Sequence, residues 1–122
     1  MVLIDANAII RIIINDNKEM ARIATDFIVE NQVLARNEVL AEVVYVLQKV
    51  YKIDRVKICN FLSGLVENDI IKTENRDVTK FALGVFGTRS LDFVDCLLYA
   101  HHSVNGNGVF TLDKALRKLV SR

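Results

Sequence analysis

Four acidic residues that are far apart along the chain occupy positions where carboxylates could gather around a metal ion. Each follows a predicted strand or lies near the start of a predicted helix: Asp5, Glu42, Asp95 and Asp113. Four carboxylates in close proximity repel one another strongly unless a cation neutralises them. Because Mg²⁺ and Mn²⁺ prefer carboxylate oxygens, we expect these residues to be the ligands of one or two such ions.

A divalent ion held by carboxylates suits the hydrolysis of phosphodiester bonds. It can generate a nucleophile from bound water, and it can stabilise charge on the scissile phosphate and the leaving oxygen. Nearby polar residues are expected to orient the ligands or a water molecule, namely Asn7, Thr111 and Asp92. The pattern predicts a hydrolase whose metal ligands are also its catalytic residues.

Each of these acids also has a simpler structural interpretation. Asp92 and Asp95 fit the first turn of a helix, and Asp113 fits the cap of the last one. Asp5 fits a strand-to-helix turn, and Glu42 could extend into solvent beside the apolar stripe of its helix. A joint site is favoured because all four acids fall on the same rim of the predicted sheet.

Short apolar runs alternate with helical patterns along the chain. The runs typical of strands are residues 2–4, 33–35, 70–71 and 109–111, with 70–71 the weakest. Apolar residues recur at helical spacing in the segments 8–14, 20–28, 39–50, 56–65, 78–86, 92–104 and 113–119, with Asn37 and Asp54 as caps of two of them. This alternation predicts an α/β domain with a parallel sheet of four or five strands and helices on both faces. Ligands of such domains bind at the carboxyl ends of the strands.

The composition limits the class of protein. The 122 residues fit one domain, 1–122, and 52% hydrophobic with 25% charged residues is typical of a globular protein. A net charge of +1 gives no bulk attraction to nucleic acid, so any such binding depends on local arrangement. Cys59 and Cys96 lack metal-like spacing, and we expect reduced core thiols. No apolar run nears the ~20 residues of a membrane span, and no signal-peptide pattern follows Met1, so we expect a cytoplasmic protein without membrane contact.

Four segments, in order, resemble the motifs of the PIN-domain family, and within it the toxin nucleases of VapBC-type toxin–antitoxin pairs. The resemblance covers nearly the whole chain. The segments are residues 2–10 with the Asp-x-Asn of Asp5 and Asn7, 37–47 with Glu42, 91–97 with the Asp-Phe-x-Asp ending at Asp95, and 109–116 with the Thr-x-Asp-x-x-Leu that contains Asp113. Two positions depart from the family pattern: Cys96 stands where alanine is usual, and Leu112 where an aromatic residue is usual.

The resemblance implies a fold, an activity and partners. The fold is a PIN-like nuclease domain with a parallel sheet in the order 3-2-1-4-5, although a fifth edge strand is doubtful because the chain stops soon after the last predicted helix. The activity is that of a Mg²⁺- or Mn²⁺-dependent endoribonuclease that cleaves RNA as a toxin. The partners are a cognate antitoxin protein that plugs the active site and a second copy in a homodimer.

The resemblance implies that some basic residues contact RNA, since RNA affinity comes largely from phosphate neutralisation. The expected contacts are Arg11, Arg89, Lys114 and Arg117, with Lys118 and Arg122 in the same C-terminal stretch. A solvated helix face would explain any one of them equally well.

Other functions stay open at this level. A PIN nuclease that matures RNA and a non-catalytic interaction module on the same fold are both compatible with the sequence. A phosphatase with an aspartyl nucleophile is disfavoured, because its second acid would stand where this chain has Asn7. The isoleucines that surround the first predicted helix, at positions 9, 10, 12, 13 and 14, indicate either a protein partner or burial under a neighbouring helix.

Overall fold

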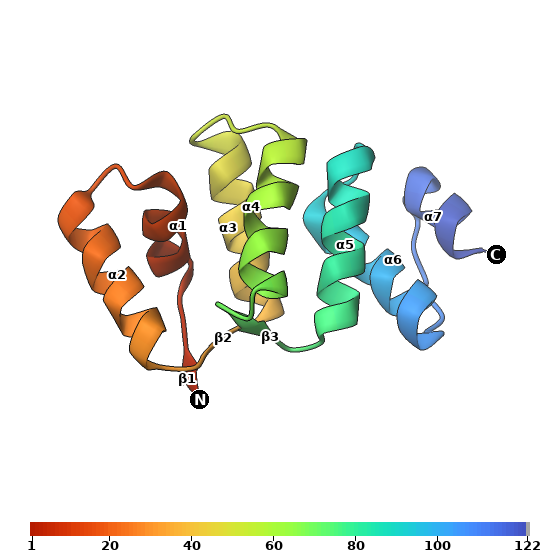
Figure 1. Ribbon diagram of the computed structural model, residues 1–122. Helices are drawn as coiled ribbons and strands as arrows, with labels where there is room; N and C mark the ends of the chain where they lie inside the picture. Colours follow the sequence, from red (N-terminus) through yellow and green to blue (C-terminus); the bar gives the residue numbers. More distant parts are fainter. Residues whose placement is uncertain (122) are drawn as a thin grey trace.

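The structure is a computed structural model that describes residues 1–121, so the basic residue expected to contact RNA at position 122 lies outside it. Figure 1 shows the helices standing in a row above a small sheet. In chain order the elements are β1 (Val2–Leu3), α1 (Ala6–Ile14), α2 (Lys18–Glu30), β2 (Val33–Ala35), α3 (Asn37–Lys49), α4 (Arg55–Glu67), β3 (Lys72–Thr73), α5 (Arg76–Thr88), α6 (Phe93–Asn105) and α7 (Lys114–Val120). None of the described helices is both long and apolar enough to cross a membrane.

The sheet has three parallel strands in the order β1-β2-β3. Val2 is paired with Val33, and Leu34 with Lys72, so β2 lies between the other two strands. This confirms an α/β domain and the part of the predicted order that concerns the first three strands. The third strand lies just after the predicted 70–71 run, of which Ile71 is buried.

The prediction of four or five strands is wrong for residues 1–121, because the segment 109–111 forms no strand. Local contacts of polar groups replace strand pairing there. The hydroxyl of Thr111 accepts from the backbone N–H of Asp113 at 3.1 Å, and its carbonyl accepts from Nε of Arg117 at 3.3 Å. Hydrogen bonds of this kind offer the backbone an alternative to a sheet. Between α7 and Ser121 there is likewise no fifth strand.

Side-chain caps start most of the described helices. The carboxylates of Asp5, Asp54 and Asp113 accept from the backbone N–H of Ala8, Lys57 and Leu116 at 2.8–2.9 Å. Such a cap satisfies a backbone donor that the helix itself leaves without a partner. The expected cap at Asn37 is wrong: Arg36 takes that position, and the N–H of Asn37 donates to Glu74 at 2.9 Å.

The core lies mainly between the helices, and from the sheet it includes Val33 and Ala35 of β2. Its largest fully buried side chains include Phe86, Ile9, Leu40 and Ile58. Cys96 is buried within it and free, and burial raises the pKa of its thiol to about 12, which keeps the sulfur protonated and inert. Cys59 is free and half-buried.

Neighbouring helices account for the isoleucine-rich helix α1. Ile9 and Ile10 are buried, while Ile13 and Ile14 are half-buried and pack against the core. Both α2 and α3 contact α1. Burial inside the domain therefore explains these side chains, and α1 needs no partner to cover it.

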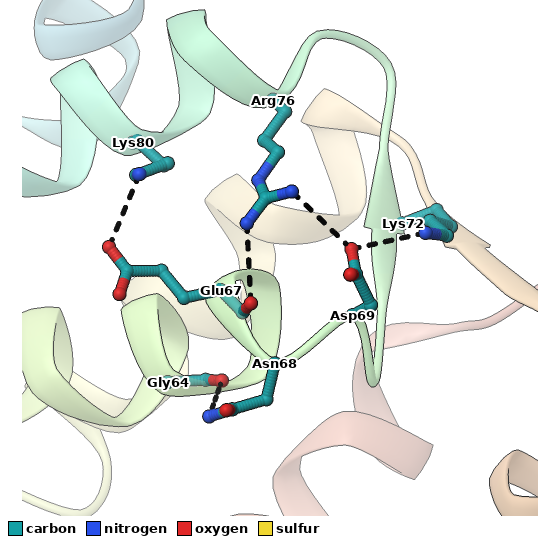
Figure 2. Close-up of polar contacts among 7 residues, drawn as sticks. All are labelled: Gly64, Glu67, Asn68, Asp69, Lys72, Arg76 and Lys80. Atoms are coloured by element: carbon teal, nitrogen blue, oxygen red, sulfur yellow. Dashed lines mark hydrogen bonds and ion pairs between the residues drawn. The ribbon is translucent and has the colours of Figure 1, made fainter.

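Polar contacts hold the end of α4 against β3 and α5 (Figure 2). Asp69 pairs with Lys72 at 3.1 Å and with Arg76 at 3.6 Å, and the Lys72 ammonium lowers the pKa of Asp69. Arg76 also donates to the carbonyl of Glu67 at 3.2 Å, and the Glu67 carboxylate pairs with Lys80 at 3.3 Å. These lysine and arginine side chains neutralise acidic residues on the same part of the surface. Exposed ion pairs of this kind contribute little to stability.

Replacing Tyr51 by phenylalanine is expected to destabilise the protein by about 1 kcal/mol, the net worth of a hydrogen bond. The Tyr51 hydroxyl accepts from Nη2 of Arg11 at 2.7 Å, and the same guanidinium pairs with Asp16. The contact joins α1 to the segment after α3. Urea unfolding measures the effect, with Tyr45→Phe as the control because Tyr45 is exposed. Equal midpoints for the two variants would contradict the role given to Tyr51.

Candidate functional site

The four candidate ligands lie at the ends or edges of four different helices. Asp5 follows β1 and caps α1, while Asp113 caps α7. Asp95 lies in the first turn of α6, and Glu42 is exposed on α3, next to the buried Val43. Asp5, Asp95 and Asp113 therefore stand at the element boundaries that the sequence predicts, whereas Glu42 lies within α3.

Asp95 is influenced by two other acids at the starts of α6 and α7. Burial raises the pKa of Asp95, and the charges of Asp113 and then Asp92 raise it further. Asp95 is half-buried, whereas the other two are exposed. We call these three residues the acidic site. Its carboxylates repel one another, and a cation placed among them would relieve that repulsion.

Asp5 and Glu42 do not join this group. The described chain contains no group of three or more His, Cys, Asp or Glu residues arranged to hold a metal ion. Neither Asp5 nor Glu42 is among the charges that shift the pKa of Asp95. The carboxylates fit Mg²⁺ in kind, but a single chain in this conformation does not assemble the four-acid site, whose assignment stays a prediction.

The three polar residues expected to orient the site have different surroundings. Thr111 is half-buried, and its hydroxyl bonds to the backbone of Asp113, which fixes the start of α7. Asp92 occupies the N-cap position of α6, but its side chain makes no capping hydrogen bond in the described structure. Its carboxylate is therefore available beside Asp95. Asn7 is exposed on α1, two residues after Asp5.

The basic residues expected to bind RNA divide into two groups. Lys114 and Arg117 are exposed on α7, which begins directly after Asp113 of the acidic site, and Arg89 is exposed just after α5. Arg11 instead uses its guanidinium to bind Asp16 and Tyr51. A phosphate at Arg11 would have to compete with those partners, and all four RNA contacts stay predictions.

Arg55 is a structural support of the site that sequence reasoning missed. Its Nη1 donates to three backbone carbonyls, those of Phe86 at 3.2 Å, Arg89 at 2.8 Å and Leu91 at 2.7 Å. The guanidinium carbon also lies 4.2 Å from the centroid of the Phe86 ring. The segment held in this way leads directly into Asp92 and α6. No local pattern predicts contacts across 31 to 36 residues of sequence.

Replacing Asp95 by asparagine is expected to stabilise the metal-free protein at neutral pH. Below the pKa of an unfolded aspartate, about 3.9, the carboxyl is protonated in both states. As the pH rises through the raised pKa of the folded state, ionised Asp95 favours unfolding, and the wild type loses stability that the amide retains.

Urea unfolding in the presence of EDTA, at several pH values, measures this effect. The midpoint of Asp95→Asn should exceed that of the wild type at neutral pH, and the gap should narrow toward pH ~4. A variant that is less stable than the wild type throughout would mean that the ionised carboxylate is favourable in the folded protein.

The fold and the acidic residues define a class of protein: a single α/β domain with a parallel sheet, in which Asp5 follows a strand and Asp95 and Asp113 stand at the starts of helices. A scan against protein families matches the PIN domain over residues 2–120. The chain therefore belongs to the PIN domain family, whose members are typically nucleases. Comparisons with curated proteins and with solved structures gave no match.

Proposed function

We propose that the protein is a metal-dependent endoribonuclease. The observation that carries the proposal is the raised pKa of Asp95 in a chain of the PIN domain family. Burial raises this pKa, and so do two neighbouring carboxylates. Acidic groups with a perturbed pKa cluster at functional sites. PIN nucleases generally use a divalent metal, and Mg²⁺ or Mn²⁺ would neutralise these carboxylates.

The candidate residues have different roles in this proposal. When bound, a divalent ion supplies an activated water and stabilises charge on the phosphate. Asp95 and Asp113, with Asp5 and Glu42, would hold it, and Thr111 fixes the position of Asp113. Lys114 and Arg117 would attract the RNA backbone to the start of α7, because phosphate charge dominates RNA affinity.

RNA cleavage in the presence and absence of a chelator tests the activity. The probe is a single-stranded RNA of mixed sequence, labelled at one end and incubated with Mg²⁺, with Mn²⁺ or with EDTA. Internal fragments that form with either metal and disappear with EDTA are expected. Cleavage that persists in EDTA, or no cleavage with either metal, would overturn the proposal.

We further propose that this nuclease is the toxin of a type II toxin–antitoxin pair, which acts on RNA in the cytoplasm and is held inactive by an antitoxin protein. The segments that contain Asp5, Asp95 and Asp113 resemble the motifs of such toxins. Induced expression should arrest growth, and co-expression of the small protein encoded beside it should relieve the arrest. Cleavage of RNA without any growth arrest would instead favour a nuclease that matures RNA. A protein that does not bind Mn²⁺ in calorimetry would instead be a non-catalytic interaction module.

A further inference from the structure

We infer that the pocket between α3 and α6 binds one unstacked nucleobase of the RNA, next to the phosphate at the acidic site. Tyr45 stacks on this base, and Gln48 forms hydrogen bonds with its polar edge, so these two residues determine substrate specificity. The identity of the ligand rests on the proposed function, but the binding measurements that test the pocket do not depend on cleavage.

The pocket between α3 and α6 has a volume of about 460 Å³ and adjoins the acidic site. Asp92 and Asp95 line it at the start of α6, and Tyr45 and Gln48 line it on α3. Residues three apart in a helix are neighbours on its surface, so Glu42 lies beside Tyr45. Candidate metal ligands therefore border this pocket on both helices.

The buried part of the lining forms an apolar floor. Phe86 and Phe93 are both buried, and their rings pack edge to face with centroids 6.0 Å apart. The guanidinium of Arg55 lies 4.2 Å from the centroid of the Phe86 ring, and Val44 of α3 is also buried in the lining. Preformed apolar walls with a few polar groups at the rim are typical of sites for small ligands.

The ring of Tyr45 is available for stacking at this pocket. Tyr45 is 62% exposed. Among residues 1–121 the aromatic pairs are Phe81 with Tyr99 and Phe86 with Phe93, so the Tyr45 ring has no aromatic partner of its own. Proteins that bind single-stranded RNA stack its bases on aromatic side chains of this kind.

Gln48 supplies the polar group that can distinguish one base from another. It is half-buried in the lining, one turn after Tyr45 on the same face of α3. Its amide carries both a donor and an acceptor. A glutamine amide pairs with adenine through one donor and one acceptor, and single-stranded RNA leaves the base edges open. We therefore expect a preference for adenine at this position.

The charges around the pocket favour a nucleotide over an apolar protein segment. Lys49 is exposed in the lining, and within the described part of the chain it forms no ion pair. Its ammonium can bind a phosphate on one side of the base, while a cation at Asp95 binds the phosphate on the other. An apolar segment would cover the floor but would leave the Gln48 amide and the Lys49 ammonium without partners.

The first test measures binding to a labelled single-stranded RNA of mixed sequence by fluorescence anisotropy, in EDTA to prevent metal-dependent cleavage. Tyr45→Ala should raise the Kd about 5- to 150-fold, the effect of losing one stacked base. Tyr45→Phe keeps the ring and should bind nearly as well as the wild type. Phe61→Ala is the matched control, because Phe61 is an exposed aromatic residue of α4 outside the pocket. Circular dichroism verifies that each variant is folded.

The contribution of Lys49 is measured by the salt dependence of the same Kd. Lys49→Gln should reduce the slope of log K against log salt by about 0.7, the value for one phosphate contact of a single strand. Lys18→Gln is the control, because Lys18 is exposed on α2 and does not line the pocket. Equal slopes for both variants would remove the phosphate contact assigned to Lys49.

The second test maps the cleavage sites of an end-labelled RNA in Mn²⁺. The wild type should cleave preferentially at sites that share an adenine at one position next to the scissile bond. Gln48→Ala should keep cleaving the RNA but lose this preference, because the stacking surface remains and the hydrogen bonds are lost. A Gln48→Ala variant with the wild-type pattern of sites would contradict the role of Gln48.

Two further outcomes would overturn the pocket itself. A folded Tyr45→Ala variant that binds the RNA as tightly as the wild type would show that no base stacks there. If light scattering shows that Tyr45→Ala converts a wild-type dimer into monomers, a second copy covers this face instead of RNA. A wild type that binds the RNA through Tyr45 but cleaves it with neither Mg²⁺ nor Mn²⁺ supports the pocket and contradicts the proposed function alone.

Discussion

Asp95→Asn is expected to lower the rate of metal-dependent RNA cleavage by at least about 100-fold, since changing even the outer partners of metal ligands costs 10–100-fold. The amide keeps the shape of the side chain but loses the charge that would bind the cation. Asp95 is the half-buried member of the acidic site, so its charge is the least screened by solvent. The initial rate with Mn²⁺ measures the loss, and calorimetry should show weaker Mn²⁺ binding.

Asp77→Asn provides the matched control for this prediction. Asp77 lies in the first turn of α5 as Asp95 lies in the first turn of α6, and it is exposed. Its replacement removes the same charge from the first turn of another helix, and we expect a rate close to that of the wild type. If both variants cleave RNA equally fast, Asp95 has no part in the reaction and a contaminating nuclease becomes the simplest explanation. Because the charge of Asp95 also destabilises the fold, the inactive variant should be the more stable one.

The helices could be predicted from the sequence more reliably than the strands. Each predicted helical segment corresponds to a helix of the structure, because a period of about 3.6 residues repeats several times within one helix. The strands have two or three residues, too few for any repeat. Val-Phe-Thr at 109–111 has the composition of a strand, but a strand also needs a neighbour, and its composition does not specify where that neighbour lies.

The candidate site could be predicted in its parts but not in its assembly. Asp113 caps a helix, as its simpler interpretation predicts, and Asp5 caps α1 at the strand-to-helix turn predicted for it. Both remain candidate ligands because a capping carboxylate has a second oxygen. The proximity of Asp113 to Asp95 depends on how α6 and α7 pack, and the absence of Asp5 from this group depends on how both helices lie relative to α1. Both are properties of tertiary structure, which motif spacing does not encode.

Arg55 is a single residue whose tertiary contacts local sequence patterns likewise do not predict. In the sequence it is the residue after the cap Asp54, and its charge is typical of a solvated helix start. In the structure it joins the start of α4 to the end of α5 and to the segment that leads into α6. The acidic site therefore depends on a cation that does not belong to it.

Arg55→Ala is expected to lower the free energy of unfolding by about 3 kcal/mol, which combines lost hydrogen bonds from a charged donor with the lost contact to an aromatic ring. Three carbonyls, of Phe86, Arg89 and Leu91, lose the donor that they share. Urea unfolding measures the change. Arg22→Ala is the control, because Arg22 pairs only with exposed acids of α2, and it should cost well under 1 kcal/mol.

Arg55→Lys separates charge from geometry at this position. Lysine keeps the positive charge, but its ammonium is compact and cannot lie flat on the Phe86 ring while donating to several carbonyls, so it should recover only part of the lost stability. Mn²⁺ affinity is the second measurement, made where each variant is fully folded. Since Arg55 holds the segment that positions Asp92 and Asp95, both variants should bind the ion more weakly than Arg22→Ala does. Arg55→Ala unfolding at the same urea concentration as Arg22→Ala would refute the support assigned to this residue.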